Sequence, residues 1–199
     1  PAWTKTMTNT QSTPAYGSLV LANAAGQAYA VTCTGEAFRA ADGERGWGHL
    51  KAFAGENTTA VVEKDRFFIW DRNGLFQLQI PGSPGPNAQA AVGKSLKFPD
   101  MWKNYMIGSP LFVNGLVYAV GDKGLLRVFD AEAGGVLYEK QLPLNPHVEY
   151  VHFPGLAASP ALAGKYIYIL DNQGGTLVLE PGREYKEVAV NRLETVEKK

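Results

Sequence analysis

The segment from His147 to His152 holds the densest group of possible metal ligands in this sequence. It reads His147-Val148-Glu149-Tyr150-Val151-His152. In an extended chain His147 and Glu149 share one face and His152 falls on the other. A metal site would therefore need a bend and a further ligand from elsewhere. We expect surface histidines in a loop, with metal binding by His147 and His152 as the alternative.

Side chains suited to covalent or acid–base catalysis form no recognisable set. The chain has one cysteine, Cys33, which cannot form an intrachain disulfide. We expect it to be a small buried side chain within a strand over residues 28–34. His49 is expected on a closing strand, with no partner visible in the sequence. We therefore assign no catalytic, cofactor-binding or metal-binding residue.

An internal repeat predicts the elements that must position these residues. Its clearest unit, residues 108–142, predicts strands over 109–113, 116–120, 125–130 and 136–142. The turn Asn114-Gly115 between apolar runs is a strong hairpin signal, because both turn residues need positive φ. Similar units open at Thr13, Thr58, Ser109 and Ser159, spaced 45, 51 and 50 residues apart. A four-stranded unit of this length is typical of a propeller blade.

The other units follow the same order of strands and turns. The sequence therefore predicts an all-β fold, a β-propeller of four-stranded antiparallel blades. The chain would form one partial propeller domain over residues 1–199. The run over 116–120 and the run over 166–170 are apolar on both faces, as strands between neighbouring blades require. About four blades are expected, at roughly residues 12–51, 57–97, 108–142 and 158–191.

Two aromatic-rich connections precede the third and fourth blades. They cover residues 98–107 and 144–154, and each links the fourth strand of one blade to the first strand of the next. Such connections emerge on one face of a propeller. Their aromatic side chains either plug the central channel and cover the blade tops, or form a recognition surface on a rigid scaffold. The candidate binding-face residues are Trp102, Tyr105, His147, Glu149, His152 and Phe153.

The repeat resembles the pyrroloquinoline-quinone-type (PQQ-like) propellers, whose blade signature is Ala-x-Asp-x-x-Thr-Gly-x-x-x-Trp. The third unit keeps this spacing with Val128, Asp130, Ala133, Gly134 and Tyr138. The first unit has a shortened version over residues 40–47 that ends in Trp47. The second and fourth units are degenerate at 78–82 and 179–182. The resemblance covers roughly residues 12–191.

The resemblance implies that the signature residues are scaffold and not a site. The aspartate side chain can cap turn amides, the glycine supplies positive φ, and the terminal aromatic ring packs against the adjacent blade. We therefore interpret Asp130, Gly134, Tyr138 and Trp47 as structural. Seven or eight blades close the ring in this family, so the chain is expected to be part of such a ring. Missing blades, or a homodimer of two such chains, would complete it.

Enzymes of this family hold a quinone cofactor and calcium in the central channel. Their best-known alcohol-oxidising branch uses adjacent cysteines, and this chain has none. Trp70, next to Asp71, is interpreted as a blade residue. We expect the chain to bind no cofactor. We expect it to be a non-catalytic scaffold for protein binding or assembly that resembles the outer-membrane assembly lipoprotein propellers. The alternative is a fragment of an alcohol or sugar dehydrogenase that binds PQQ and calcium.

Composition narrows the partners further. The 19 basic and 19 acidic residues give a formal net charge of zero, which argues against a nucleic-acid or anionic-membrane surface. No apolar stretch approaches the roughly 20 residues of a membrane helix. The chain begins Pro-Ala-Trp, and we expect a processed or truncated N-terminus. From the resemblance we expect a periplasmic or extracellular protein with an unidentified protein partner.

Overall fold

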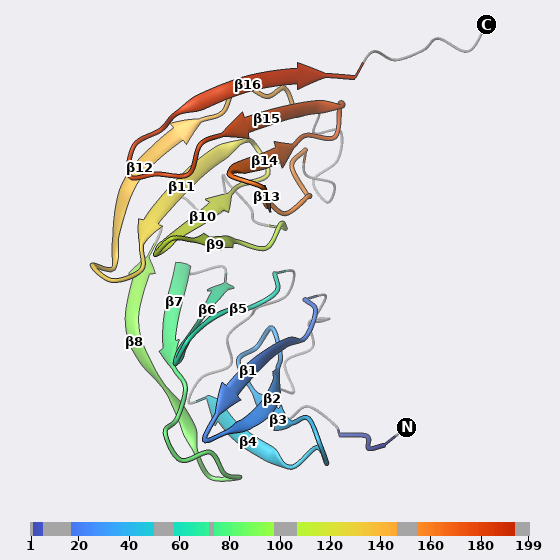
Figure 1. The fold of residues 1–199 in the computed structure, drawn as a ribbon, viewed down its shortest axis with the longest axis vertical. Helices are drawn as coiled ribbons and strands as arrows, with labels where there is room; N and C mark the ends of the chain where they lie inside the picture. The colour runs from blue at the N-terminus through green and yellow to red at the C-terminus, as the bar shows by residue number, and fades with distance from the viewer. Residues whose placement is uncertain are drawn as a thin grey trace, which may run out of the picture. The chain divides into compact units, whose positions relative to one another are not determined.

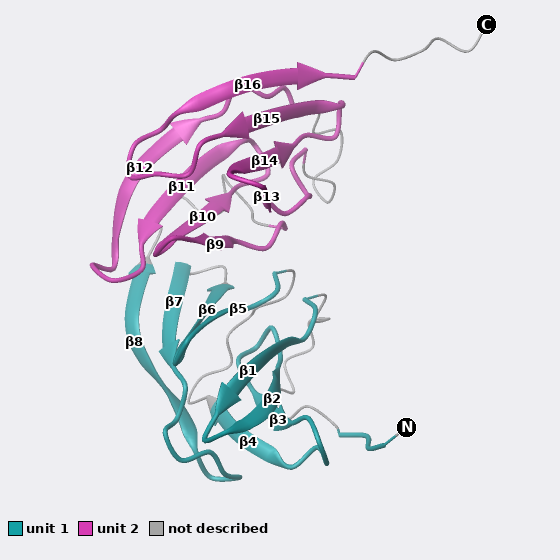
Figure 2. Cartoon of the chain, viewed as in Figure 1, with its two compact units in different colours: residues 1–101 teal, residues 102–199 magenta. Residues whose placement is uncertain are grey.

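The computed structural model describes residues 2–5, 17–49, 58–71, 74–97, 107–146 and 155–193. Within these ranges the chain forms strands and turns and no helix. The described residues thus contain no helical segment of the length and apolarity that crossing a bilayer needs. The chain divides into two compact units, residues 1–101 and 102–199 (Figure 2). Each unit contains two four-stranded blades (Figure 1), which confirms the predicted all-β blade architecture.

Unit 1 contains blade 1 (β1–β4) and blade 2 (β5–β8) in one eight-stranded sheet of order β1-β2-β3-β4-β8-β7-β6-β5. Strands within each blade are antiparallel, but β4 and β8 pair in parallel, with Gly48 opposite Gln89. The long outer strand of blade 2 therefore continues along the outer edge of blade 1. The strands are β1 (Val20–Ala24), β2 (Gln27–Val31), β3 (Ala37–Arg39), β4 (Arg45–His49), β5 (Val61–Glu63), β6 (Arg66–Asp71), β7 (Gly74–Gln79) and β8 (Gln89–Lys97).

Unit 2 contains blade 3 (β9–β12) and blade 4 (β13–β16) as two separate four-stranded sheets. In each of them the strands follow one another in sequence order and all neighbours are antiparallel. The strands are β9 (Leu111–Val113), β10 (Leu116–Val120), β11 (Leu125–Asp130), β12 (Gly135–Gln141), β13 (Ala161–Ala163), β14 (Tyr166–Leu170), β15 (Gly175–Leu179) and β16 (Glu187–Arg192).

The predicted strands over 116–120, 125–130 and 166–170 coincide with β10, β11 and β14. In the first blade, the predicted opener at Thr13 lies outside the described residues, and the described first strand is Val20–Ala24. Cys33 is buried, as predicted, with 2 % of its surface exposed. However, it lies in the turn after β2 and not in a strand, because β2 ends at Val31.

The hairpin between β9 and β10 confirms the predicted turn chemistry. Asn114 has φ of 51° and Gly115 has φ of 80°, so both central residues lie in the left-handed region that a two-residue hairpin of this type requires. Glycine reaches this region without the strain that a Cβ atom would add. The turn aligns β9 and β10 so that Tyr118 lies opposite Leu111.

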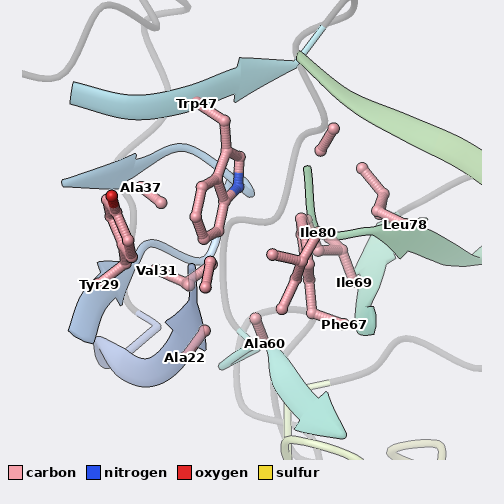
Figure 3. Packing of buried hydrophobic residues seen from close by; sticks show 12 residues of the cluster. Ala22, Tyr29, Val31, Ala37, Trp47, Ala60, Phe67, Ile69, Leu78 and Ile80 are labelled. Carbon is pink, nitrogen blue, oxygen red and sulfur yellow. The ribbon is translucent and has the colours of Figure 1, made fainter. Parts of the chain in front are cut away.

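The core of unit 1 lies between blades 1 and 2. Trp47 of β4 is fully buried, and its ring lies 5.1 Å from that of Tyr29 and 6.4 Å from that of Phe67 in blade 2 (Figure 3). The terminal aromatic ring of the first signature therefore packs against the adjacent blade, as predicted. Burial of these rings stabilises the contact between two sheets that neither blade could cover alone.

The core of unit 2 lies between blades 3 and 4 in the same way. All five residues of β10 are buried, so this strand is covered on both faces as predicted. In β14 the two faces differ, since Ile167 and Ile169 are buried against blade 3. Tyr166 and Tyr168 are half-buried and Leu170 is exposed. The described structure thus covers blade 4 on one face more fully than on the other.

Candidate functional site

The six candidate binding-face residues lie outside the described residues, so their role stays a prediction. They are Trp102, Tyr105, His147, Glu149, His152 and Phe153. His49 lies in β4 as predicted, and its side chain is also outside the described part. Across the ranges that the structure does describe, no three His, Cys, Asp or Glu side chains gather as metal ligands would. The candidate site must therefore be built from other residues.

Asp130 at the end of β11 organises the signature turn. One carboxylate oxygen, Oδ1, accepts hydrogen bonds from the backbone N–H groups of Glu132 and Ala133, both at 2.9 Å. The other, Oδ2, lies 2.7 Å from Nη1 of Arg183 in blade 4. These contacts lower the pKa of Asp130, the Ala133 amide most and Arg183 next. With Gly134 at φ of 74°, the arrangement confirms the structural interpretation of this signature.

Residues 181–186, in the loop between β15 and β16, contact blade 3. We call this segment the blade 4 clasp. The backbone N–H of Gly182 donates to Oη of Tyr118 at 2.9 Å. The Tyr185 ring lies edge-on to Tyr138 at 6.5 Å, with the ammonium of Lys140 5.3 Å from its centroid. Burial raises the pKa of the Tyr118 and Tyr138 phenols, so both stay protonated as hydrogen-bond donors.

In unit 1, residues 81–88 lie in the corresponding loop between β7 and β8 of blade 2. They contact blade 1 through backbone hydrogen bonds and not through side chains. The N–H of Gly85 donates to the carbonyl of Gly46 at 2.6 Å, and the N–H of Gly48 donates to that of Ala88 at 2.9 Å. Both loops begin with Pro-Gly, at Pro81 and Pro181. The two degenerate signatures thus lie in the blades whose loops contact the preceding blade.

A pocket of about 400 Å³ opens beside the blade 4 clasp. Two hairpin turns and the end of β15 build it, and Val113 and Leu162 supply its apolar surface. Leu162 is 46 % exposed although it is a large apolar residue. Seven residues line the pocket: Val113, Asn114, Leu162, Gly164, Lys165, Glu180 and Pro181.

The charged residues that line this pocket are Lys165 and Glu180, and Lys186 pairs with Glu180 from outside the lining. Glu180 Oε2 lies 2.6 Å from Nζ of Lys186, and this hydrogen bond lowers the pKa of Glu180 and raises that of Lys186. Lys165 adds a weaker electrostatic effect on Glu180, and its ammonium lies 5.1 Å from the Tyr166 ring centroid.

This geometry suits recognition of an apolar group next to a carboxylate. The exposed side chain of Leu162 can contact an apolar group, and Lys165 can attract a negative one. The sequence signal for the site was weak. No sequence motif marks Lys165, and residues 179–182 carry only a degenerate signature. The pairing of β14 with β15 brings Lys165 and Glu180 together within blade 4, and blade 3 adds Val113 and Asn114 to the pocket.

The described strands and interfaces define a propeller-type β protein, and comparison with known proteins agrees. No protein-family model and no curated protein matches the chain. Among solved structures, the chain is similar to BamB from Moraxella catarrhalis, with 12 % identity and a TM-score of 0.56, over 86 % of this chain and 47 % of that one. It is similar to the quinohemoprotein alcohol dehydrogenase ADHIIG from Pseudomonas putida HK5, with 15 % identity and a TM-score of 0.59, over 90 % and 34 %.

A third similar structure is the computationally designed Ika4 protein, with 12 % identity and a TM-score of 0.56, over 87 % of this chain and 95 % of that one. At these identities the likeness shows the fold alone, a β-propeller. The chain spans less than half the length of the BamB and ADHIIG chains. It spans nearly all of Ika4.

Proposed function

We propose that this chain is a non-catalytic PQQ-like propeller segment that binds another protein as an assembly scaffold, through the pocket beside the blade 4 clasp. The observation that carries the proposal is the exposed apolar side chain of Leu162 in a pocket that also holds the charged side chains of Lys165 and Glu180. Protein-binding surfaces combine these two properties, because apolar burial supplies affinity and charge supplies steering.

The use of the acidic side chains within the fold supports the same proposal. Asp171 Oδ1 accepts hydrogen bonds from the N–H groups of Gln173 and Gly175, and its Oδ2 accepts one from Asn145. Asp130 is engaged in the same manner with its own turn and with Arg183. These carboxylates fix turns and neighbouring blades, which is a scaffold role.

The resemblance to outer-membrane assembly lipoprotein propellers extends the proposal to a periplasmic or extracellular setting with a protein partner. The competing proposal is a quinoprotein dehydrogenase fragment that binds PQQ and calcium. Its support is the fold shared with ADHIIG. The two proposals differ in what the purified chain should bind, so one pair of experiments separates them.

Site-specific photo-crosslinking tests the protein-binding proposal. A photoreactive amino acid at Leu162 should give a discrete crosslinked protein in cells. The same label at Val136, which is 42 % exposed on blade 3 and outside the pocket, should not. Adding Lys165→Glu should reduce the Leu162 product at least several-fold. Equal crosslinking from both positions, unchanged by Lys165→Glu, would contradict the proposal.

Cofactor titration tests the competing proposal. Pyrroloquinoline quinone and Ca²⁺ are added to the purified chain, and bound quinone is measured by its absorbance together with dye reduction by an alcohol. We expect no stoichiometric binding and no alcohol-dependent reduction. A bound quinone at one per chain would overturn the non-catalytic proposal.

A further inference from the structure

The outer edge of blade 1 accepts an added strand within this chain. The outer strand β4 pairs in parallel with the first residues of β8, which belongs to blade 2. The backbone N–H of Gly48 donates to the carbonyl of Ala88, and the carbonyl of Gly46 accepts a hydrogen bond from the N–H of Gly85. The outer strand of a blade can thus act as a template for a further parallel strand.

The outer strand of blade 4, β16, directs its backbone groups in the same alternating way. The N–H of Leu193 donates to the carbonyl of Gly174 at 3.0 Å, so Leu193 faces the third strand of the blade. Backbone groups of successive residues alternate in direction, so Asn191 also faces β15, while Val190 and Arg192 point away from it. In the described part of the chain, the sheet of blade 4 ends at β16 (Figure 1).

The side chains at this edge are apolar and exposed. Val190 lies opposite Leu177, which in turn lies opposite Ile169. Leu177 and Ile169 are fully buried, whereas Val190 is 37 % exposed. Val188 and Leu193 are 45 % and 78 % exposed. An apolar row therefore crosses blade 4 and ends at its outer edge, where an apolar residue of an added strand would extend it.

The outer edge of blade 3 is polar at the corresponding positions. Leu142 is the counterpart of Leu193, because the N–H of each donates to the glycine that precedes the third strand of its blade. Leu142 is only 3 % exposed. Glu139, three residues earlier, therefore corresponds to Val190, and it forms an ion pair with Arg127 on the neighbouring strand. Charged side chains protect an edge from strand addition, so β12 has a protection that β16 lacks.

We propose that the outer edge of β16 binds an extended strand of another protein, added in parallel to Glu187–Arg192. The charges at the two ends of β16 define the guest strand. Glu187 begins β16, Arg192 ends it, and both are exposed. A parallel guest would meet them with a basic residue first, an acidic residue last and apolar residues between. The edge shares no residue with the pocket beside the blade 4 clasp, so this proposal does not depend on the proposed function.

Calorimetric titration with two peptides tests the added strand and its direction. The probe is acetyl-Lys-Val-Thr-Val-Thr-Glu-amide, and the control, acetyl-Glu-Val-Thr-Val-Thr-Lys-amide, reverses the charges alone. The probe should bind about fivefold more tightly than the control, because both of its charges then meet opposite ones. Tighter binding of the control would indicate antiparallel addition and contradict the proposal. Absence of binding by either peptide at about 1 mM would overturn it.

Amide hydrogen exchange measured by nuclear magnetic resonance locates the bound peptide. In the chain alone, the N–H groups of Val190 and Arg192 should exchange faster than that of Asn191, because only Asn191 directs its N–H toward β15. The probe peptide should slow exchange at Val190 and Arg192 at least tenfold. Binding that leaves both rates unchanged would place the peptide elsewhere and contradict the proposal.

Proline substitution removes the outward N–H and leaves the pairing with β15 in place. Val190→Pro should weaken binding of the probe peptide about tenfold, since one hydrogen bond is lost and its acceptor is left unpaired. Glu139→Pro is the matched change on β12 and should leave binding unchanged. Equal binding by the parent chain and Val190→Pro would overturn the proposal.

A second variant keeps the test decisive where the proline variant does not fold. Val190→Lys retains the backbone N–H and adds a charge to the edge, and it should also weaken binding of the probe peptide several-fold. Light scattering of the chain alone identifies a different occupant. Self-association that Val190→Lys abolishes would assign the edge to a second copy of this chain, which contradicts the proposal.

Discussion

The buried Oη atom of Tyr118 in blade 3 accepts a hydrogen bond from the backbone N–H of Gly182 in blade 4, 64 residues further along the chain. The same hydroxyl lies 3.3 Å from the Gly182 carbonyl oxygen and can donate to it. One side chain thus pairs both polar groups of one peptide segment at the start of the blade 4 clasp. Backbone groups at such an interface need partners, because an unpaired buried N–H costs free energy.

Replacing Tyr118 with phenylalanine should therefore lower the free energy of unfolding by about 1–2 kcal/mol, since the Gly182 N–H loses its acceptor. Urea denaturation measures the change. Tyr168→Phe is the matched control, because Tyr168 is in the same position of blade 4, and it should stay within about 0.5 kcal/mol of the parent chain. If both variants lost the same free energy of unfolding, the hydrogen bond between Tyr118 and Gly182 would make no specific contribution to stability.

Replacing Trp47 with alanine should lower the free energy of unfolding by about 3–5 kcal/mol, because the change removes a fully buried ring between two blades and leaves a cavity. Trp47→Phe keeps an aromatic ring against Tyr29 and Phe67. It also removes an indole N–H that has no hydrogen-bond partner among the described residues. We expect Trp47→Phe to lower the free energy of unfolding by less than half as much as Trp47→Ala. Similar unfolding midpoints for both variants would argue against Trp47 as the ring that joins blades 1 and 2.

Replacing Gly115 with alanine should destabilise the chain by about 1 kcal/mol, through backbone strain alone. Gly115 has φ of 80°, and an added Cβ would meet no atom within 4 Å. Gly85→Ala is the control, because its Cβ would also meet open space and its φ lies outside the left-handed region. Thermal unfolding should separate the two variants. A neutral Gly115→Ala would contradict the assigned turn.

The carboxyl group of Asp42 should titrate with a pKa of about 2, since Arg39 and the Glu44 amide donate hydrogen bonds to its ionised form. A pKa below the ordinary value of about 4 means that the ion pair stabilises the fold above that pH. The contribution then disappears as the pH falls from about 4 to about 2. Nuclear magnetic resonance of the Asp42 carboxyl carbon measures the midpoint.

Arg39→Gln should raise the Asp42 midpoint toward the ordinary range, because the first of these donors is lost. Arg192→Gln, an exposed change in β16 of the other unit, should leave it where it is. The effect on stability should be small and salt-dependent, since the pair lies at the surface. An Asp42 midpoint near 4 in the parent chain would contradict the ion pair.

Local sequence signals account for most of the described strands. The turn at Asn114 and Gly115 was predictable because only a few residue types tolerate two consecutive positive φ angles. The apolar runs that became β10 and β14 were predictable because strands between blades need apolar residues on both faces. The signature at Asp130 was recognisable as scaffold, since its carboxylate serves the turn three residues along.

Three features were not predicted from the sequence, and one of them depends on residues far apart in the chain. The strand over 20–24 was not predicted, and it pairs with β2 across a short turn. The parallel pairing of β4 with β8 joins backbone groups about 40 residues apart, and backbone groups carry no sequence signal. Cys33 lies in a turn because β2 stops at Val31.

The sequence by itself determined the repeat, its turns and the blade type, since these follow from φ preferences and apolar periodicity over a few residues. Only the tertiary structure decided that the two Pro-Gly loops reach back to a preceding blade. It also decided that Val113 of blade 3 lines one pocket with Leu162 and Glu180 of blade 4. These contacts arise when sheets pack face to face, and the matching of two surfaces is a property of neither strand alone.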